Sequence, residues 1–418
     1  MQETFLHYLF EHQLITNTEF EIISPGTKNT NAGPDFFNAK IKIGSTIWAG
    51  NIEIHIHSSD WHKHKHNNDK AYDSIILHLV LIHDQDIYTT KGVLIPTFEI
   101  KFNSKLYDKY TQLLQNKTWI HCEKEIKKID SLTKLSYIES LAIERLKRKN
   151  KYFKDLLTYN TNNWEETFYQ ALAKGFGGKL NAIPFELLTK SIPLNILQKH
   201  QNNIIQIEAL LFGQSGLLEN KSENDVYYNQ LQKEYNFLKN KYNLTPIRIE
   251  LWKFSKIRPY NFPSIKIALF AQLVFKHQNL LSKIIDCSTI EDVKKLFNIT
   301  ASSYWTTHYR FLKDSKELIK TLGYGSIQHL IINILIPFLF TYSESTNKDD
   351  IKEKYFNWYS NLDKEDNSIT KKWEELNFKN QNAMQSQGLI ELKNEKCDKH
   401  KCIDCRIGHK ILTLSWNE

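Results

Sequence analysis

The chain has 418 residues, which is enough for two or three domains and a large buried core. Hydrophobic residues make up 41% and charged residues 24%, a balance that excludes a disordered chain and indicates a globular protein. The net charge of +8 is compatible with a polyanionic partner such as nucleic acid without requiring one.

The first part of the chain mixes helix and strand patterns. Residues 1–4 lack the basic start of a signal peptide, and no long apolar core follows, so we expect a cytoplasmic protein. A helix is predicted over 3–13 and another over 107–116. Strand-like segments lie between them, at 18–24, 39–43, 46–57, 73–83 and 93–102. We therefore predict a mixed sheet with flanking helices as a first domain over 1–120.

One polar constellation stands out in this domain. Asp35 follows a Gly-Pro turn at the start of a strand, and Glu53, His55 and His57 alternate with isoleucines along the next strand. Alternation places the acid and the histidines on one face of the sheet. Two carboxylates and a nitrogen on neighbouring strands can bind a divalent metal ion. The alternative is a solvated polar face, which is common on half-exposed strands.

These residues resemble the core of the PD-(D/E)XK nuclease superfamily. Pro34-Asp35 matches its first element, and Glu53-Ile54-His55 matches its acid-x-Lys triplet, with His55 in place of Lys. The resemblance covers roughly the first 100 residues. It implies a restriction-endonuclease-like sheet, Mg²⁺ or Mn²⁺ held by Asp35 and Glu53, and a nucleic-acid substrate. His55 would orient or deprotonate the attacking water, and Glu11 would supply the further acid that such families often carry on an N-terminal helix.

A second resemblance runs through nearly the whole chain. The segments that carry it include Asn31-Ala32-Gly33-Pro34-Asp35-Phe36, Ser59-Asp60-Trp61, Leu210-Leu211-Phe212-Gly213-Gln214, Arg258-Pro259-Tyr260-Asn261-Phe262-Pro263 and Cys402-Ile403-Asp404-Cys405-Arg406-Ile407-Gly408. Together they look like an uncharacterised bacterial family with a domain of unknown function. That resemblance implies no activity.

A histidine-rich segment follows the second strand. His62, His64 and His66 come directly after Trp61, with several aspartates nearby. Imidazole suits Zn²⁺, and Mn²⁺ sites tolerate it, so one interpretation is a transition-metal site. The other is a solvated loop. His78 lies inside an apolar strand and is interpreted as a core histidine whose hydrogen bonds are satisfied.

From 121 to 395 the pattern is helical, and we predict a large all-α domain. Expected helices lie at 132–157, from 163 to a break at Gly175-Phe176-Gly177-Gly178, and at 200–213, 224–242, 263–278, 289–297, 315–322, 325–340, 348–360, 368–376 and 382–395. The most apolar run, 327–342, contains polar residues and a proline and is too short to span a bilayer, so we predict a buried helix and no membrane binding.

Basic and aromatic residues interleave within this domain. Arg248, Lys253, Lys256, Arg258 and Lys266 alternate with Trp252, Phe254, Tyr260 and Phe262. Such a pattern suits single-stranded nucleic acid, but the favoured interpretation is helix packing with the basic groups extending outward to solvent. The four-residue break at 175–178 lacks the Lys and Ser/Thr of a phosphate-binding loop and is interpreted as a helix terminator.

The tail, 396–418, is predicted to form a metal knuckle. Cys397, Cys402 and Cys405 fall within nine residues, and a closed tetrahedral site needs a fourth ligand. Cys122, His400 and His409 are the candidates for that position. Zinc is the expected structural ion; an iron–sulfur cluster and free thiols are the alternatives.

Three functions fit these patterns. The first is a metal-dependent nuclease. The second is a non-catalytic nucleic-acid-binding or assembly protein on a degenerate nuclease-like core, which the missing lysine motivates. The third is a metallophosphoesterase for a small substrate that uses the histidine-rich segment. Lys40 and Lys42 decide between the first two, because either ammonium beside Glu53 would replace the missing lysine.

Overall fold

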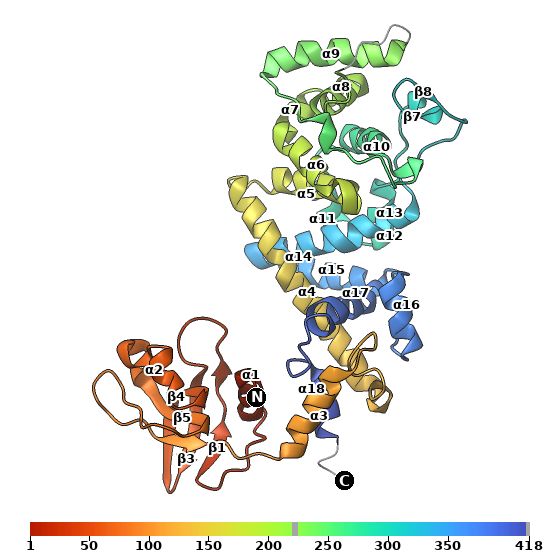
Figure 1. The fold of residues 1–418 in the computed structure, drawn as a ribbon. Helices are drawn as coiled ribbons and strands as arrows, with labels where there is room; N and C mark the ends of the chain where they lie inside the picture. Colours follow the sequence, from red (N-terminus) through yellow and green to blue (C-terminus); the bar gives the residue numbers. More distant parts are fainter. Residues whose placement is uncertain (220–224, 415–418) are drawn as a thin grey trace. The chain divides into compact units, whose positions relative to one another are not determined.

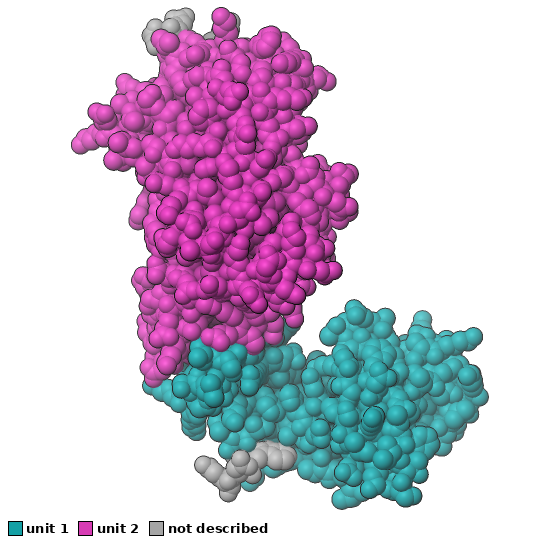
Figure 2. Space-filling model, turned by 180° about the vertical axis from the view of Figure 1, so that it is seen from behind, with its two compact units in different colours: residues 1–137, 392–418 teal, residues 138–391 magenta. Residues whose placement is uncertain are grey.

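The computed structural model describes residues 1–219 and 225–414, and the chain divides into two compact units (Figures 1 and 2). Unit 1 comprises residues 1–137 and 392–418, and unit 2 comprises residues 138–391. The sequence placed these divisions near 120 and 395, with the tail as a third segment. In the structure the tail belongs to unit 1, because Ile403 and Leu412 lie in the same hydrophobic core as the N-terminal helix.

Unit 1 contains a six-stranded mixed sheet with helices around it. Its elements are α1 (Glu3–Glu11), β1 (Phe20–Ser24), β2 (Thr27–Lys28), β3 (Phe36–Ile43), β4 (Thr46–His57), α2 (Asp60–Lys63), η1 (His66–Asn68), η2 (Lys70–Ser74), β5 (Ile75–Ile82), β6 (Thr97–Glu99), α3 (Ser104–Gln115), η3 (Ile126–Lys128), η8 (Leu392–Cys397) and α18 (Arg406–Thr413). The helix α4 (Ser131–Tyr159) begins in unit 1 and ends in unit 2. The expected α+β class, with a mixed N-terminal sheet followed by a large helical region, is confirmed.

The order of the strands explains how distant polar residues meet. The sheet runs β1-β3-β4-β5-β6, with β2 paired to β3. The pairs β1–β3 and β3–β4 are antiparallel, whereas β4–β5 and β5–β6 are parallel. Because β4 and β5 are parallel, their connection must cross over one face of the sheet. That connection is α2, η1 and η2, so the histidine-rich segment covers β4.

Both faces of β4 are covered, which changes the expectation for its polar residues. On one face Ile52 and Ile54 pack with Phe5 and Leu9 of α1 in a continuous core. On the other, Trp61 packs in a smaller cluster that also contains Tyr72, Ile75, Ile87 and Ile95. Glu53 and His55 are 4% and 1% exposed. The solvated polar face is therefore wrong, and these buried polar groups need partners.

Unit 2 is mainly helical. Its elements are α5 (Trp164–Phe176), α6 (Gly178–Ser191), α7 (Leu194–Lys199), α8 (Ile204–Gln214), α9 (Val226–Tyr242), η4 (Ile249–Leu251), η5 (Pro259–Asn261), α10 (Pro263–Lys276), α11 (Leu280–Asp286), α12 (Ile290–Leu296), η6 (Ser303–Thr306), β7 (His308–Arg310), β8 (Lys313–Asp314), α13 (Tyr324–Leu330), η7 (Ile331–Leu335), α14 (Ile336–Thr346), α15 (Asp349–Asn361), α16 (Ser368–Glu375) and α17 (Ala383–Glu391). The start of the helix expected at 224 lies outside the described residues.

Two expectations in unit 2 need correction. The segment 315–322 is not a helix; it follows the small hairpin of β7 and β8, and its backbone bonds to 299–307. Lys266 does not extend outward to solvent, because only 8% of it is exposed. The aromatic residues of that region do pack internally, as expected: the guanidinium of Arg310 lies 4.4 Å from the ring of Phe254 and 4.7 Å from that of Phe262.

The apolar run forms a longer helix than the sequence indicated. α13, the π-helical turn η7 and α14 join into Tyr324–Thr346, whose 23 residues are long and apolar enough to cross a membrane by length and composition. Two thirds of its most apolar window (67%) is buried within the protein. The residues of η7 and α14 contribute to the main hydrophobic core of unit 2, and this packing supports the prediction of a core helix.

Candidate metal centre

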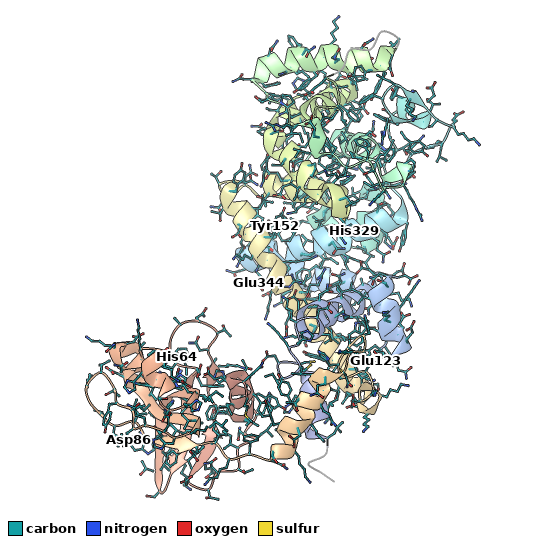
Figure 3. All side chains as sticks on the ribbon, viewed as in Figure 1. His64, Asp86, Glu123, Tyr152, His329 and Glu344 are labelled. Carbon is teal, nitrogen blue, oxygen red and sulfur yellow. The ribbon has the colours of Figure 1, made fainter. Side chains whose placement is uncertain are left out.

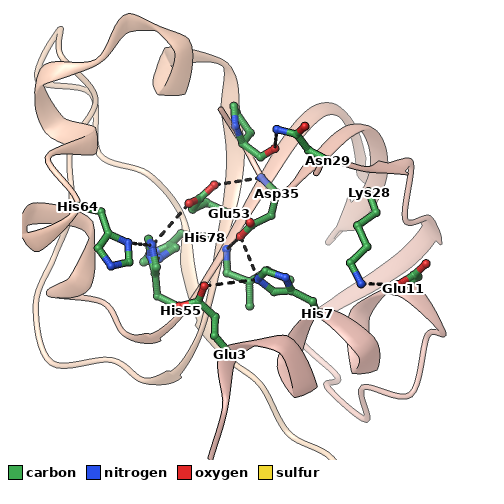
Figure 4. A network of polar contacts seen from close by, with 12 residues as sticks. Glu3, His7, Glu11, Lys28, Asn29, Asp35, Glu53, His55, His64 and His78 are labelled. Carbon is green, nitrogen blue, oxygen red and sulfur yellow. Dashed lines mark hydrogen bonds and ion pairs between the residues drawn. The ribbon is translucent and has the colours of Figure 1, made fainter. Parts of the chain in front are cut away.

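Asp35 and Glu53 adjoin each other at the start of β3. The register pairs Phe36 with Ile52, which brings the residue before β3 next to Glu53 on β4. The backbone N–H of Asp35 donates to Glu53 Oε2 (3.2 Å), and the N–H of Ile54 donates to Asp35 Oδ2 (2.9 Å; Figure 4). The preceding turn is held by the side-chain amide of Asn29, which donates to the carbonyl oxygens of Asn31, Ala32 and Pro34.

The environment of Glu53 disfavours its charged form. Burial raises the pKa of Glu53 to about 9, and the nearby negative charge of Asp35 adds to this effect. A carboxylate in such a place is stable as an anion only if a cation lies beside it. The nearest groups to its other oxygen are imidazole nitrogens.

Two histidines lie beside Glu53 Oε1, and a third lies beside one of them. The distances to His66 Nε2 and His55 Nε2 are 3.1 Å and 3.5 Å, and His55 Nε2 lies 3.1 Å from His64 Nδ1. The ligand atoms of the three histidines all lie within 4.8 Å of one another. Donor atoms bound to one tetrahedral ion at about 2.0–2.2 Å are separated by roughly 3.3–3.5 Å. The three histidines therefore form a group of possible ligands to one ion, and Glu53 lies beside two of them, His55 and His66.

The approach of His66 to Glu53 is the most informative contact. His66 Nε2 is buried and has no hydrogen-bond partner among the described residues, although Glu53 Oε1 is 3.1 Å away. Burial lowers the pKa of His66, so its imidazole is neutral near pH 7. A neutral imidazole nitrogen and a carboxyl oxygen at this distance could both bind one ion, and the ion would in turn stabilise the charged form of Glu53.

The loop that carries these histidines is anchored to the sheet. Lys65, between His64 and His66, has a left-handed backbone (φ 64°), which turns the chain sharply at this point. The ring of Tyr72 stacks on His66 with centroids 3.8 Å apart, and Trp61 meets His66 edge to face. His64 remains exposed, so the loop presents one open side. The solvated-loop interpretation is therefore wrong for His66 but fits His62, which is exposed.

His78 on β5 supports His55 from behind. The parallel register pairs Glu53 with His78, and His55 Nδ1 lies 2.8 Å from His78 Nε2. Burial, together with the neighbouring histidines, lowers the pKa of His55 to about 2 and that of His78 to about 3, so both rings are neutral. If His55 donates from Nδ1, its Nε2 lone pair faces the centre, as a ligand requires. The sequence correctly predicted a buried His78 but not its contact with His55. The feature that could have indicated this contact is a single histidine inside an apolar strand.

Residues 3–368 match the model of a family described as "Protein of unknown function (DUF2851)". The chain belongs to this family. No curated protein and no solved structure matches it. The resemblance to a family of unknown function is thus confirmed over nearly the whole chain, while the similarity to PD-(D/E)XK nucleases stays a prediction.

The helix α1 of this DUF2851 protein reaches the centre through residues other than Glu11. Glu11 pairs with Lys28 at 3.0 Å, away from Glu53 (Figure 4). His7 Nε2 lies 3.2 Å from Asp35 Oδ2, and Glu3 Oε1 lies 3.8 Å from the same nitrogen. Burial opposes the charged form of His7, but the carboxylate of Asp35 outweighs it and raises the pKa of His7. The spacing of Glu3, His7 and Glu11 by four residues contained this signal, since all three share one helix face.

Neither lysine that was proposed to replace the missing one lies near Glu53. The register pairs Lys40 with Ala49 and Lys42 with Ile47, and both side chains are exposed. Ala49 is four residues from Glu53, about 14 Å along a strand, which is longer than a lysine side chain. By this criterion the DUF2851 protein lacks the lysine of the nuclease pattern, and the non-catalytic alternative gains support.

Four of the five cysteines gather at the other end of unit 1. Burial raises the pKa of the thiols of Cys122 and Cys397, and the nearby thiols of Cys402 and Cys405 raise both further. Burial also raises the pKa of Cys402 to about 12. Cys122 lies just before η3, Cys397 ends η8, and the other two precede α18. The chain therefore brings these thiols near one another, but among the described residues only His55, His64 and His66 form a group with the spacing of metal ligands, and the cysteines do not.

The loop from Cys402 to Gly408 is tight around the thiol of Cys405. A Cβ at Gly408 would lie 2.0 Å from the carbonyl oxygen of Cys402, so only glycine fits there. Burial raises the pKa of Cys405, while hydrogen bonds from the backbone N–H groups of Gly408 and Ile407 to its sulfur lower it. Backbone donors directed at a sulfur favour its thiolate form, which is the form that binds metal.

The other candidates for the fourth ligand have different partners. His409 Nδ1 lies 3.0 Å from the hydroxyl of Tyr8, and its ring stacks on His12 at 4.0 Å. His400 contacts His121 through Nδ1. Electrostatic coupling to the other thiols favours Cys122 as the fourth member. Zinc at this cluster remains a proposal, with an iron–sulfur cluster as the alternative.

Proposed function

We propose that unit 1 is a metal-dependent phosphodiester hydrolase that acts on nucleic acid. The observation that supports this most is the group of His55, His64 and His66, with Glu53 Oε1 3.1 Å from the buried Nε2 of His66. Three nitrogens favour Mn²⁺ or Zn²⁺ over Mg²⁺, which prefers oxygen ligands. The sequence predicted Mg²⁺ or Mn²⁺ at this site; with imidazole ligands we propose Mn²⁺ or Zn²⁺ instead.

The roles of the residues follow from their positions. Glu53, His55, His64 and His66 would hold the ion, and His78 would fix the orientation of His55. A bound ion of this kind lowers the pKa of a water ligand towards neutrality and neutralises charge on a phosphate group. Asp35 lies beside Glu53 and accepts from Ile54 N–H, with His7 next to its free side. The pair Asp35 and His7 is placed to accept and pass on a proton from the attacking water.

Neutral His55 cannot act as the cation that the nuclease pattern places there. In this proposal the charge of the ion takes over the task of the missing lysine, so His55 is a ligand and not a base. This assignment replaces the expectation that His55 orients or deprotonates the water. It also explains why Lys40 and Lys42 need not reach Glu53.

Two other functions remain in consideration. The distance of Lys40 and Lys42 from Glu53 favours a non-catalytic nucleic-acid-binding protein on the same core. The three-histidine set favours a metallophosphoesterase for a small substrate. The non-catalytic protein should bind nucleic acid without metal and without cleaving it. The metallophosphoesterase should hydrolyse a small phosphoester but not a polymer.

One set of assays separates them. Purified protein, stripped with a chelator and reloaded with Mn²⁺, Zn²⁺ or Mg²⁺, is incubated with single- and double-stranded DNA and RNA and with bis-p-nitrophenyl phosphate. We expect cleavage of a polymer with Mn²⁺ or Zn²⁺ and none after chelation. Asp35→Asn should slow cleavage but retain the metal. Cleavage that survives chelation, or metal binding without any hydrolysis, would contradict the proposal.

A further inference from the structure

Unit 2 contains a cavity that has no part in the metal centre. It has a volume of about 320 Å³ and lies between the end of α5, the start of α6, α10 and α13. Its described lining includes Lys179, Lys266 and His329 but no aspartate or glutamate. Figure 3 marks His329 in the helical part of the chain. A cavity lined by cationic side chains without acidic ones is suited to an anion.

Lys266 is the unusual member of this lining. It is 8% exposed, and its ammonium donates to Ser326 Oγ at 3.2 Å. No ion pair joins it to a carboxylate among the described residues. Burial lowers the pKa of Lys266 to about 8, so the ammonium is still largely charged at pH 7. A buried cation with three N–H donors and one neutral partner is costly unless an anion completes its surroundings.

A second buried lysine, Lys149, lies near the cavity, and burial lowers its pKa to about 7, so it is only partly charged at pH 7. Lys149 on α4 donates to the carbonyl and side-chain oxygens of Asn333 at 3.2 and 3.1 Å. The side-chain amide of Asn333 in turn lies 3.2 Å from His329 Nδ1. His329 lines the cavity and is exposed there; partial desolvation, followed by the charges of Lys149 and Lys266, lowers its pKa. An anion in the cavity would relieve this mutual repulsion and favour protonated His329.

Glycines of the segment that joins α5 to α6 line the same cavity as Lys266. Gly178 has φ +55°, and a Cβ there would meet nothing within 4 Å, whereas a Cβ at Gly177 would lie 2.2 Å from the carbonyl oxygen of Asn181. The segment that ends α5 is therefore more than a helix terminator, because its backbone forms part of the cavity lining. A side chain at Gly178 would extend into open space, and its backbone favours glycine.

We propose that this cavity binds a small organic phosphate, with its phosphate group at Lys266, Lys179 and His329. The organic part would lie against the apolar lining, which includes Phe176, Leu322 and Leu330. A doubly charged phosphate matches several cations that lack acidic partners better than a singly charged carboxylate does. The inference is independent of the hydrolase proposal, because none of these residues belongs to unit 1.

The test uses the full-length protein and three probes at constant ionic strength: inorganic phosphate, adenosine 5′-monophosphate and adenosine. Calorimetric titration should detect the first two and not adenosine, with the nucleotide binding more tightly. Lys266→Met keeps the length of the side chain and removes its charge, so we expect at least a tenfold loss of affinity for both phosphates. Lys276→Met, an exposed lysine on the same helix, is the matched control and should bind as the parent does.

Folding is checked separately from binding. Without ligand, Lys266→Met should melt at the same temperature as the parent or higher, because it removes a buried charge without a counter-ion. If neither phosphate binds, or if Lys266→Met and Lys276→Met bind them equally, the inference is wrong. Binding of adenosine as tight as that of its monophosphate would also overturn it, since the site would then recognise the organic part alone.

Discussion

Glu53→Gln is the substitution that most directly tests the metal centre. It keeps the shape of the side chain and an oxygen that can accept from the N–H of Asp35. What it removes is the only carboxylate within 3.5 Å of both His55 Nε2 and His66 Nε2 among the described residues. The variant should therefore fold as the parent does, but the proposed ion would lose the negative charge of the Glu53 carboxylate.

The size of the effect follows from simple electrostatics. A carboxylate about 3 Å from a divalent ion contributes roughly 11 kcal/mol of attraction at an effective dielectric constant of about 20. If desolvation offsets three quarters of this, about 3 kcal/mol remains, which corresponds to a roughly 100-fold increase in Kd. The free energy of unfolding of the metal-free protein should change by no more than about 1.5 kcal/mol, since the substituted amide can still accept the hydrogen bond from Asp35.

The assay measures both quantities on the same preparations. Calorimetric titration of Mn²⁺ and Zn²⁺ gives the affinity, denaturant unfolding without metal gives the stability, and cleavage of nucleic acid gives the activity. Glu21→Gln, an exposed acid on β1 of the same sheet, is the control and should behave as the parent. If Glu53→Gln binds metal and cleaves as the parent does, the chemistry lies elsewhere and the donor set around His66 is coincidental.

Three further outcomes are expected. His78→Leu removes the support of His55 and should weaken metal binding about 10–100-fold, whereas exposed His62→Ala should not; equal affinities would remove His78 from the site. Cys402→Ser should release a bound metal and lower the melting temperature, with Cys287→Ser in unit 2 as control; an unchanged melting curve and no metal in the parent would identify ordinary thiols. Sulfate, which keeps its charge, should bind the unit 2 cavity with affinity falling by up to about tenfold per pH unit above about 8, where Lys266 deprotonates and His329 is already neutral; a flat profile would contradict this.

The sequence contained the strand alternation that brought out Glu53 and His55, and the Gly-Pro turn that aimed Asp35. The alternation and the turn are local features, which is why the sequence reveals them. In the structure, the pairing of Phe36 with Ile52 then places Asp35 beside Glu53, as expected. The alternation could not show that the segment of α2, η1 and η2 covers the polar face of β4. Whether a polar face is solvated depends on the crossover between β4 and β5, and that depends on long-range parallel pairing.

The residues that the sequence analysis missed also owe their positions to long-range packing. His7 approaches Asp35 because α1 packs across the sheet, and His66 approaches Glu53 because Trp61 anchors the loop. Neither contact has a fixed spacing in sequence. Lys266 was expected to point outward because basic residues beside aromatics usually do. Its burial depends on where α13 lies against α10, which no local pattern reveals.

The replacement of lysine by His55 and the presence of three further histidines are best understood as one feature. At 1% exposure, with His78 at 2.8 Å and His64 at 3.1 Å, an ammonium at position 55 would be buried among imidazoles and beside any ion they hold. Like charges at such distances repel strongly in a medium that water does not reach. A neutral ring avoids this repulsion and adds a ligand. A degenerate site would need no such coordination between β4, β5 and the crossover loop, because loss of the lysine alone would suffice. In the proposed site, a bound ion supplies the positive charge that the nuclease pattern takes from a lysine, and neutral histidines hold it.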